Sequence, residues 1–451
     1  MSVAPSLISI RAALEGALPA VIATCARDGT PNVSYVSEVH YVDCDHVALS
    51  FQFFSKTRQN VLENPRATVV VVHPRTGAQY RLGVRYLRTE DSGPLFARMK
   101  AKLAGIASHS GMAGVFRLRG SDVYRVESLL EVPGTAVLPE PPGADYLGPL
   151  RAAATRMAGA PDLATLFDIT FDCLLDAFGV RHGMVFMSDT AGRNLYAVAT
   201  RGYSESGIGA EILPGQGVIG AAASAQAAIR ISHATSEFGY GRAAREATER
   251  SGLHDGLEEE ISLPGLAESQ SQIAVPMLAG GRLVGVLYAE SPETSRFGYE
   301  EEDALCVLAA IVANSTDLYD PPPELVDDPP QQQTPPIPQG EPLRVRRYPE
   351  NDSIFIGEDY LIKGVAGAIL WRLARGYVEE RRTDYTNREL RLDPAIRLPD
   401  VSENLEARLI LLQRRLEERC PSLCIEKTGR GRFRLNVLRP LVLQDVRPGA
   451  T

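Results

Sequence analysis

The chain has 451 residues, too many for one ordinary domain, so two to four domains are expected. Its hydrophobic fraction of 44% is normal for a globular protein, no apolar run reaches membrane-spanning length, and no signal-peptide pattern opens it. The six cysteines are scattered without CxxC spacing, so we predict no metal site and expect a reduced, cytoplasmic protein.

Two biased stretches divide the chain. Residues 133–147 are rich in proline and glycine, and residues 319–342 are richer still in proline. Because such sequence favours extended chain and cannot join a packed core, both stretches are predicted linkers. The predicted order is a domain at 1–132, a linker at 133–147, a domain at 148–318, a linker at 319–342, a domain at 343–440 and a tail at 441–451.

The first domain begins with a predicted helix near Ile8–Gly16 and continues as a series of short strands. A turn at Arg27–Pro31 separates two of the strands, and a second helix is predicted over Pro94–Gly105. Strands at this spacing predict an antiparallel barrel. The predicted strands are Ala20–Cys25, Asn32–Val42, His46–Phe53, Ala67–His73, Gln79–Thr89 and Val115–Glu127.

The stretch Phe51–Pro65 carries the most suggestive chemistry of this domain. A strand ends there, Ser55 can cap a short helix, and Lys56, Thr57 and Arg58 occupy its first turn. Free backbone N–H groups and the helix dipole favour an anion at such an end, and two hydroxyls with two cations suit a phosphate dianion. An ordinary capped surface helix is the alternative interpretation.

The first domain as a whole resembles the pyridoxamine 5'-phosphate oxidase-like FMN-binding split barrel. The resemblance rests on Gly29-Thr30-Pro31, on Ser55 to Asn60, on Asn64-Pro65-Arg66-Ala67 and on the strand at Gln79, in family order. It implies FMN, with Ser55, Lys56, Thr57 and Arg58 near the phosphate and Gln79 and Arg81 near the flavin. Some relatives bind F420 or haem instead, and members usually form homodimers with the flavin at the subunit interface.

The middle domain begins with helical sequence from Leu147 to Phe178 and ends with an amphipathic helix over Glu300–Asn314. The segment Ser271–Ser291, two strands around an Ala-Gly-Gly-Arg turn, resembles the signature of a GAF domain, an α/β sandwich. The resemblance implies a sensor fold without naming its ligand, because GAF pockets bind cyclic nucleotides, haem, bilins, small acids or nothing. Strands are predicted over Gly183–Ser188, Asn194–Thr200, Gln272–Leu278 and Leu283–Glu290.

The third domain ends in a long predicted helix that starts near Ser402. Its leucines recur at helical spacing and form one apolar face, and Arg408, Arg415 and Arg419 form a basic stripe beside that face. Asp400 or Ser402 can cap the start of the helix. A stripe of this kind suits the major groove of DNA, although arginines beside leucines are also common on a solvated flank.

A two-stranded hairpin follows this helix. Its tip, Gly429 to Arg432, contains two glycines and presents Arg430 and Arg432, which suits contact with phosphates. The run Gly429–Leu435 resembles the wing, and Thr386–Leu392 an upstream helix, of the winged helix-turn-helix domain of OmpR-type response regulators. That resemblance implies DNA binding, with double-stranded DNA as the partner.

The charge distribution agrees with a DNA-binding end. Residues 343–440 contain 20 Lys and Arg against 15 Asp and Glu, a net charge of +5 in a chain whose total is −9. An acidic body with a basic end fits a protein whose terminal domain meets the phosphate backbone.

Together these features predict a multidomain α+β protein: split barrel, GAF domain and winged helix. The predicted function is a cytoplasmic, homodimeric transcription regulator in which a flavin or a GAF ligand controls DNA binding. The alternative is an oxidoreductase that uses FMN or F420 and carries a regulatory GAF domain. The sequence identifies no catalytic residue for that alternative.

Overall fold

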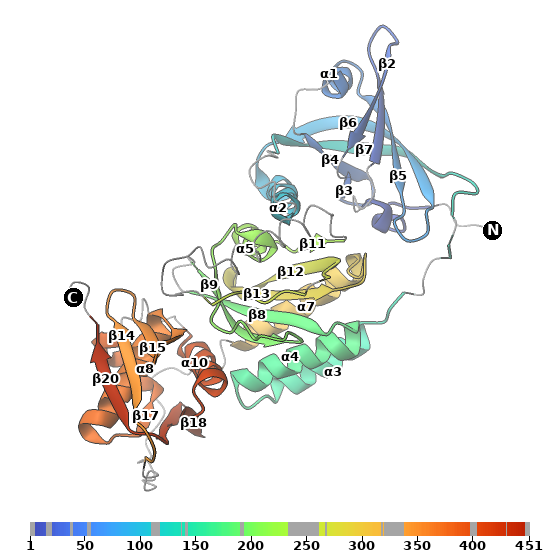
Figure 1. Ribbon diagram of the computed structural model, residues 1–451. Helices are drawn as coiled ribbons and strands as arrows, with labels where there is room; N and C mark the ends of the chain where they lie inside the picture. The colour runs from blue at the N-terminus through green and yellow to red at the C-terminus, as the bar shows by residue number, and fades with distance from the viewer. Residues whose placement is uncertain are drawn as a thin grey trace.

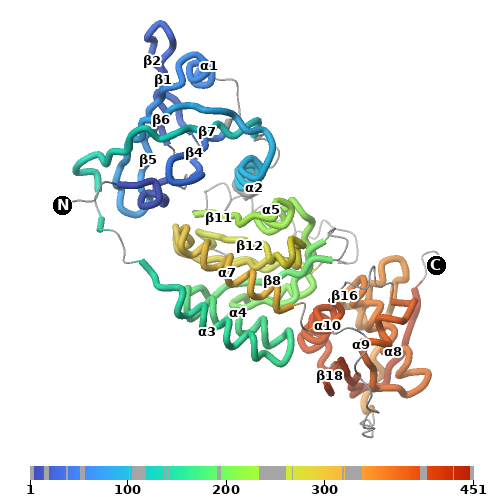
Figure 2. The backbone as a smooth tube through the Cα atoms, turned by 180° about the vertical axis from the view of Figure 1, so that it is seen from behind, coloured from blue at the N-terminus to red at the C-terminus, as the bar shows by residue number. Residues whose placement is uncertain are grey.

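The computed structural model describes residues 5–14, 20–36, 39–51, 56–109, 118–136, 138–139, 143–189, 194–232, 261–266, 268–316, 319, 338–396, 404–429 and 431–446. These residues form three domains that follow one another along the molecule (Figure 1). The view from behind shows the same order, with the middle domain contacting both neighbours (Figure 2). No helix in the described ranges is both long and apolar enough to cross a membrane.

The N-terminal domain is built on a seven-stranded antiparallel sheet in the order β2-β1-β5-β6-β7-β4-β3. The long strands β6 and β7 pair along their length, with two register shifts of the kind that bends a sheet. The elements are η1 (Arg11–Leu14), β1 (Ala20–Cys25), β2 (Pro31–Val36), β3 (Val39–Tyr41), β4 (His46–Phe51), α1 (Lys56–Glu63), β5 (Arg66–Val72), β6 (Gln79–Glu90), α2 (Gly93–His109) and β7 (Gly120–Glu131).

Five of the six predicted strands of this domain each overlap one observed strand, with ends that differ by up to five residues, whereas the predicted strand Asn32–Val42 is two strands, β2 and β3. Alternation explains the agreement: in β5 every second side chain is buried, and the same period is visible in the sequence. One prediction is wrong in part, because the helix expected near Ile8–Gly16 is a single 3-10 turn at Arg11–Leu14, with residues 15–19 outside the described ranges. Ala13 and Leu14 of that turn are buried in the barrel core.

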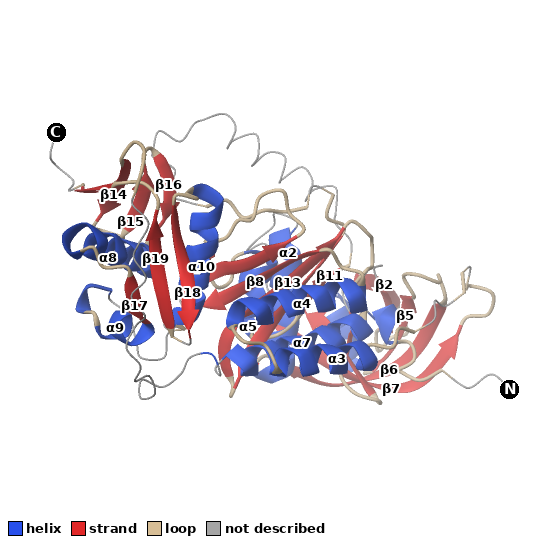
Figure 3. Cartoon of the chain, turned by 90° about the horizontal axis from the view of Figure 1, so that it is seen from below, coloured by secondary structure: helices blue, strands red, loops and turns tan. Residues whose placement is uncertain are grey.

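The middle domain is a six-stranded sheet in the order β10-β9-β8-β13-β12-β11 with helices on both faces. Helices α3, α4 and α7 cover one face and α5 the other (Figure 1), and the view from below places α3, α4 and α7 in front of the sheet (Figure 3). The predicted helical stretch from Leu147 to Phe178 is two helices, and Asp162 caps the second. The elements are α3 (Leu147–Ala158), α4 (Leu163–Phe178), β8 (His182–Ser188), β9 (Leu195–Arg201), β10 (Glu211–Ile212), α5 (Gly217–Ala225), β11 (Ile229–Ile231), β12 (Ser271–Ala279), β13 (Arg282–Ser291) and α7 (Tyr299–Thr316).

The C-terminal domain combines a four-stranded sheet, ordered β16-β15-β14-β20, with three helices and a three-stranded sheet, ordered β17-β19-β18. The predicted tail needs correction, because residues 441–445 form β20, which pairs in parallel with β14. The elements are β14 (Leu343–Tyr348), β15 (Ser353–Ile356), β16 (Asp359–Ile362), α8 (Gly364–Glu380), β17 (Asp384–Thr386), α9 (Asn387–Leu392), η3 (Pro394–Ile396), α10 (Leu405–Arg419), β18 (Leu423–Gly429), β19 (Arg432–Val437) and β20 (Leu441–Asp445).

The domains touch through specific side chains. Between barrel and middle domain, Arg11 forms an ion pair with Asp303 at 3.0 Å and lies 4.0 Å from the centre of the Tyr299 ring. Between the middle and C-terminal domains, α10 packs against β9 and α4. One continuous cluster of buried apolar residues runs through this second contact, which is called the α10 joint below.

Candidate functional site

The first candidate site is the N-terminal end of α1 in the barrel domain. Lys56 opens the helix and is exposed. Oγ1 of Thr57 accepts a hydrogen bond from Nδ2 of Asn32 at 2.9 Å and lies 2.7 Å from Oγ of Ser34. Because the backbone N–H groups of a first helical turn have no acceptor within the helix, this end favours an anion.

Arg58, on the same helical turn, is engaged by the protein itself. Its Nη1 donates hydrogen bonds to the carboxylate of Asp122 on β7, and its Nη2 donates to Oγ1 of Thr89 at 2.9 Å. Asp122 is only 6% exposed. Burial opposes the charge of Arg58, but hydrogen bonding to Asp122 and the charge of Asp122 outweigh burial and raise the pKa of the guanidinium.

Two tyrosines extend this buried network. Oγ1 of Thr89 donates to Oδ1 of Asp122 at 2.6 Å and lies 2.7 Å from the Tyr86 hydroxyl. The ring of Tyr124 stands edge-on to that of Tyr86, with 5.6 Å between centroids, and burial raises the pKa of the Tyr124 phenol. The ion pair is thus enclosed by neutral groups, which makes it a structural feature of the barrel interior.

Gln79 and Arg81 lie far from this end of α1. They are at the start of β6, whereas Thr89, which contacts Arg58, is at its end. Ten residues of β6, with the two register shifts that bend this strand, separate the two ends along the chain. The structure therefore divides the predicted cofactor residues of one chain into two separate groups. The backbone N–H of Gln79 donates to Oγ1 of Thr135 at 2.9 Å, and Arg81 is exposed.

A phosphate would fit the first group in part. Lys56 and the hydroxyls of Thr57 and Ser34 offer one cation and polar groups at a helix N-terminus, while the charge of Arg58 is already neutralised. Ser55 lies outside the described residues. Sequence reasoning missed Asn32 and Ser34, although alternation along β2 places both on one side of that strand.

The middle domain contains a buried polar group near one end of its sheet. Glu290 is 2% exposed, its Oε1 accepts a hydrogen bond from the backbone N–H of Leu266 at 2.9 Å, and its Oε2 accepts one from the Tyr288 hydroxyl at 3.2 Å. Burial, together with the charge of Glu290, raises the pKa of Tyr288 and of Tyr203. The bond to Leu266 fastens the segment 261–266 against the sheet.

The glycine run Gly215–Gly220 has a structural role in the same domain. A Cβ atom at Gly220 would come within 2.3 Å of the carbonyl oxygen of Leu213, and Gly217 has a φ of +62°. The run therefore permits a tight approach of backbone at the start of α5.

In the C-terminal domain, α9 and α10 begin with well-defined caps. Thr386 and Glu389 form a capping box at α9. At α10 the cap is Asn404, whose side chain accepts a hydrogen bond from Ala407 N–H at 3.0 Å. This corrects the prediction of a cap at Asp400 or Ser402, which lie outside the described residues.

The arginines predicted to contact DNA have different surroundings. Arg419 is exposed and Arg432 is half-buried on the hairpin, whereas Arg430 lies outside the described residues. The guanidinium of Arg408 is 3.5 Å from the centre of the Tyr196 ring in the middle domain. Arg408 therefore belongs to the α10 joint in this structure.

Arg415 is a buried residue of the C-terminal domain. It is 5% exposed, and its Nε donates to the carbonyl oxygen of Leu361 on β16 at 2.9 Å. Burial lowers the pKa of its guanidinium. This burial corrects the prediction that Arg415 faces DNA, because helical spacing alone does not reveal that β16 covers that side of α10.

Two family models match the chain. Residues 8–126 match the pyridoxamine 5'-phosphate oxidase model, and residues 162–315 match the GAF domain model. No curated protein matches the chain.

Solved structures resemble one domain at a time. An FMN-binding protein from Syntrophomonas wolfei subsp. wolfei is 19% identical over 27% of this chain and 78% of its own, with a TM-score of 0.22. The GAF domain of a phosphoenolpyruvate-protein phosphotransferase from Acinetobacter is 19% identical over 38% and 90%, with a TM-score of 0.29. A free methionine-R-sulfoxide reductase from Neisseria meningitidis is 22% identical over 40% and 94%, with a TM-score of 0.28.

Both matched segments fall within the domains that the fold separates. The antiparallel sheet of the N-terminal domain and the helix-covered sheet of the middle domain agree with these assignments. Residues 8–126 are thus a pyridoxamine 5'-phosphate oxidase-like domain, and residues 162–315 are a GAF domain.

Proposed function

We propose that this protein is a cytoplasmic, flavin-binding transcription regulator whose C-terminal domain is a winged helix that binds double-stranded DNA. The observation that carries the proposal is the order of elements after residue 343: an antiparallel hairpin sheet, then α8, β17, α9, α10 and the β18–β19 hairpin. Helix-strand-helix-helix-hairpin is the order expected of a winged helix, with α10 as the groove-reading helix and the hairpin as the wing.

Electrostatics supports DNA as the partner. The C-terminal domain carries an excess of cations, whereas the rest of the chain is strongly acidic. Arg419 on α10 and Arg432 on the hairpin come from the two elements that a winged helix presents to a duplex. In this proposal they contact phosphates, which position the domain without reading sequence.

The barrel domain is proposed to hold FMN, with its phosphate on Lys56 and Thr57 at the start of α1. When bound, the flavin supplies a ring that accepts and releases electrons, so its redox state can be a signal. Lys56 and Gln79 of one chain are at opposite ends of the barrel site. In a homodimer, one flavin could contact Lys56 of one subunit and Gln79 of the other. The exposed side chains Val33 and Tyr35, on edge strand β2, support a homodimer.

Replacing Lys56 with alanine is expected to weaken FMN binding about 10-fold or more. The change removes one charge-assisted hydrogen bond to a phosphate, worth about 1.5–3 kcal/mol, and 1.4 kcal/mol is a factor of ten. Titration of apoprotein with FMN, followed by flavin fluorescence, measures this effect. Gln59→Ala, on an exposed site of the same helix, is the matched control and should bind normally. Equal affinity for FMN in both variants would show that the FMN phosphate does not bind at the start of α1.

Replacing both Arg419 and Arg432 with alanine is expected to lower the affinity for duplex DNA about 10-fold at low salt. The slope of log K against log salt should also fall by about 2, since each lost phosphate contact removes about 0.9. Fluorescence anisotropy with a labelled duplex over a salt series measures both quantities. Arg375→Ala, an exposed arginine on α8, is the control. Unchanged binding in the double variant contradicts the proposed DNA surface, and steady turnover of a reduced nicotinamide cofactor would favour the oxidoreductase alternative.

A further inference from the structure

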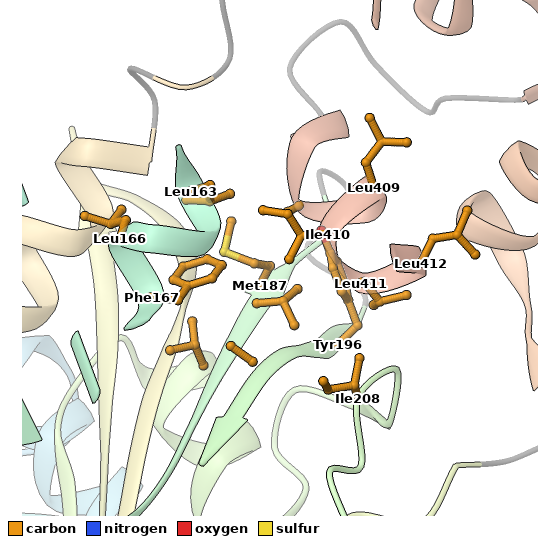
Figure 4. Packing of buried hydrophobic residues seen from close by; sticks show 14 of the residues in the cluster. Leu163, Leu166, Phe167, Met187, Tyr196, Ile208, Leu409, Ile410, Leu411 and Leu412 are labelled. Carbon is orange, nitrogen blue, oxygen red and sulfur yellow. The ribbon is translucent and has the colours of Figure 1, made fainter. Parts of the chain in front are cut away.

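Helix α10 is buried on two sides. Toward its own domain it presents Leu405, Leu409, Leu412 and Leu416, all at most 7% exposed. Toward the GAF domain it presents a second apolar face that includes Ile410 and Leu411, which are 7% and 2% exposed. Figure 4 shows these two side chains directed toward Met187 and Tyr196 of the GAF sheet, whereas Leu409 and Leu412 point away from it.

Polar contacts reinforce the same joint. Nη1 of Arg414 donates to the carbonyl oxygen of Val198 on β9 at 3.2 Å, and Oγ of Ser206 donates to the carboxylate of Glu418 at 2.8 Å. The Tyr196 ring lies between α10 and the GAF sheet and is 2% exposed. The GAF domain therefore covers the outward face of α10 with both apolar and hydrogen-bonding groups.

The GAF surface at this joint presents carboxylates to cations of the C-terminal domain. Among the described residues, three pairs cross between the domains: Arg414 with Asp168 at 3.6 Å, Lys427 with Asp162 at 3.9 Å, and Lys363 with Glu211 at 3.5 Å. Lys427 lies on strand β18 of the hairpin and Lys363 directly before α8. An acidic surface thus meets basic groups on and around α10, where a DNA-binding domain would meet phosphates.

We infer that the arrangement described here is a DNA-off state in which the GAF domain occupies the surface of α10 that a duplex would need. This inference rests on the proposed function, because it concerns control of the same helix. A helix in a major groove turns its outward face toward the bases, and that face is the one in contact with Met187 and Tyr196. The GAF domain and a DNA duplex therefore cannot occupy this face of α10 at the same time.

The linker allows the domains to separate while they remain tethered. Tyr319 donates its hydroxyl hydrogen to the carbonyl oxygen of Ala160, and the N–H of Gln339 donates to the carbonyl oxygen of Leu438. The 19 residues between them, 320–338, would span about 60 Å if extended at 3.1 Å per residue. Separation breaks the three ion pairs, which DNA phosphates can replace, and exposes Ile410 and Leu411, which the bases would cover in part. A signal opens the joint only if it binds the separated arrangement more tightly than the closed one.

The test reverses two carboxylates on the GAF side and leaves the C-terminal domain unchanged. Asp168→Arg combined with Glu211→Arg places like charges opposite Arg414 and Lys363, and both carboxylates are partly exposed in the closed chain. Asp176→Arg combined with Glu268→Arg, at exposed GAF positions, is the control with the same change in net charge. Small-angle X-ray scattering of the full chain reports opening, and anisotropy with a labelled duplex at fixed salt reports affinity.

We expect the joint variant to have a larger radius of gyration and a Kd for duplex at least 10-fold below that of the wild type, with the control unchanged. If the wild type binds DNA and the opened variant binds it no more tightly, the inference is overturned and the proposed function stays intact. Absence of DNA binding in wild type and opened variant alike overturns the proposed function, and the inference with it. Ile410→Asp is a second way to open the joint, and only its radius of gyration is compared, because Ile410 lies on the face that the duplex would meet. An unchanged radius in both variants also overturns the inference.

Discussion

Replacing Arg58 with alanine is expected to destabilise the barrel domain by about 3–5 kcal/mol, because removing one partner of a buried ion pair leaves an uncompensated charge. That charge is on Asp122, which is 6% exposed and accepts hydrogen bonds from Arg58 and Thr89. Denaturation by urea, followed by circular dichroism, measures the loss. The fluorescence of Trp371, the single tryptophan of the chain, should change little at low urea because it reports the C-terminal domain.

The double variant Arg58→Met with Asp122→Leu is the control for this prediction. It removes both charges and keeps apolar volume, so it should recover most of the lost stability. A loss of less than about 1 kcal/mol in Arg58→Ala would instead indicate a solvent-screened pair. In that case Arg58 would be available to an anion, and FMN titration of Arg58→Ala should then show the larger defect.

Local patterns predicted the elements of the barrel. Strand β1 is observed over Ala20–Cys25, as predicted, because a run of β-formers is followed by a turn at Asp28-Gly29. The partner of Arg58 was not predicted, since Asp122 lies 64 residues away and no local pattern couples the two positions. The prediction that Arg58 binds a phosphate therefore assumes an unpaired cation, whereas in the fold Arg58 is paired with Asp122.

The same reasoning explains the errors in the C-terminal domain. The leucine spacing of α10 predicted one buried face, and Leu409 and Leu416 are indeed buried. The spacing of the leucines does not predict the second apolar face, with Ile410 and Leu411, although both residues are apolar. A helix that is apolar on most of its circumference is typical of burial on two sides, and this signal could have predicted a partner for α10.

Pairing between residues far apart in the sequence explains what the sequence did not predict. Residues 441–445 form a short segment after Pro440, and the sequence predicts a tail there. In the structure they complete a sheet by pairing with β14, which lies nearly a hundred positions earlier in the chain. The GAF and barrel resemblances are confirmed, because family models match residues 162–315 and 8–126. The winged helix, its DNA contacts and the homodimer remain predictions, supported by element order, charge and exposed side chains.

Replacing Arg415 with alanine is expected to lower the stability of the C-terminal domain by about 2–3 kcal/mol. The change leaves the carbonyl oxygen of Leu361 without its donor and removes the packed stem of a side chain that is 5% exposed. Unfolding followed by Trp371 fluorescence measures the loss, since that residue lies on α8, which packs against α10.

Arg419→Ala is the matched control, because Arg419 lies one turn further along α10 and is exposed. Arg419→Ala should leave the unfolding midpoint nearly unchanged and should lower the affinity for DNA. Arg415→Ala, measured under conditions in which it is folded and in a chain opened at the joint, should keep its affinity for DNA. The two positions thus separate a structural arginine from a phosphate contact on one helix. If Arg415→Ala weakened DNA binding about 10-fold without a change in stability, Arg415 would have to leave the Leu361 carbonyl on opening. The buried position described here would then belong to the closed chain alone.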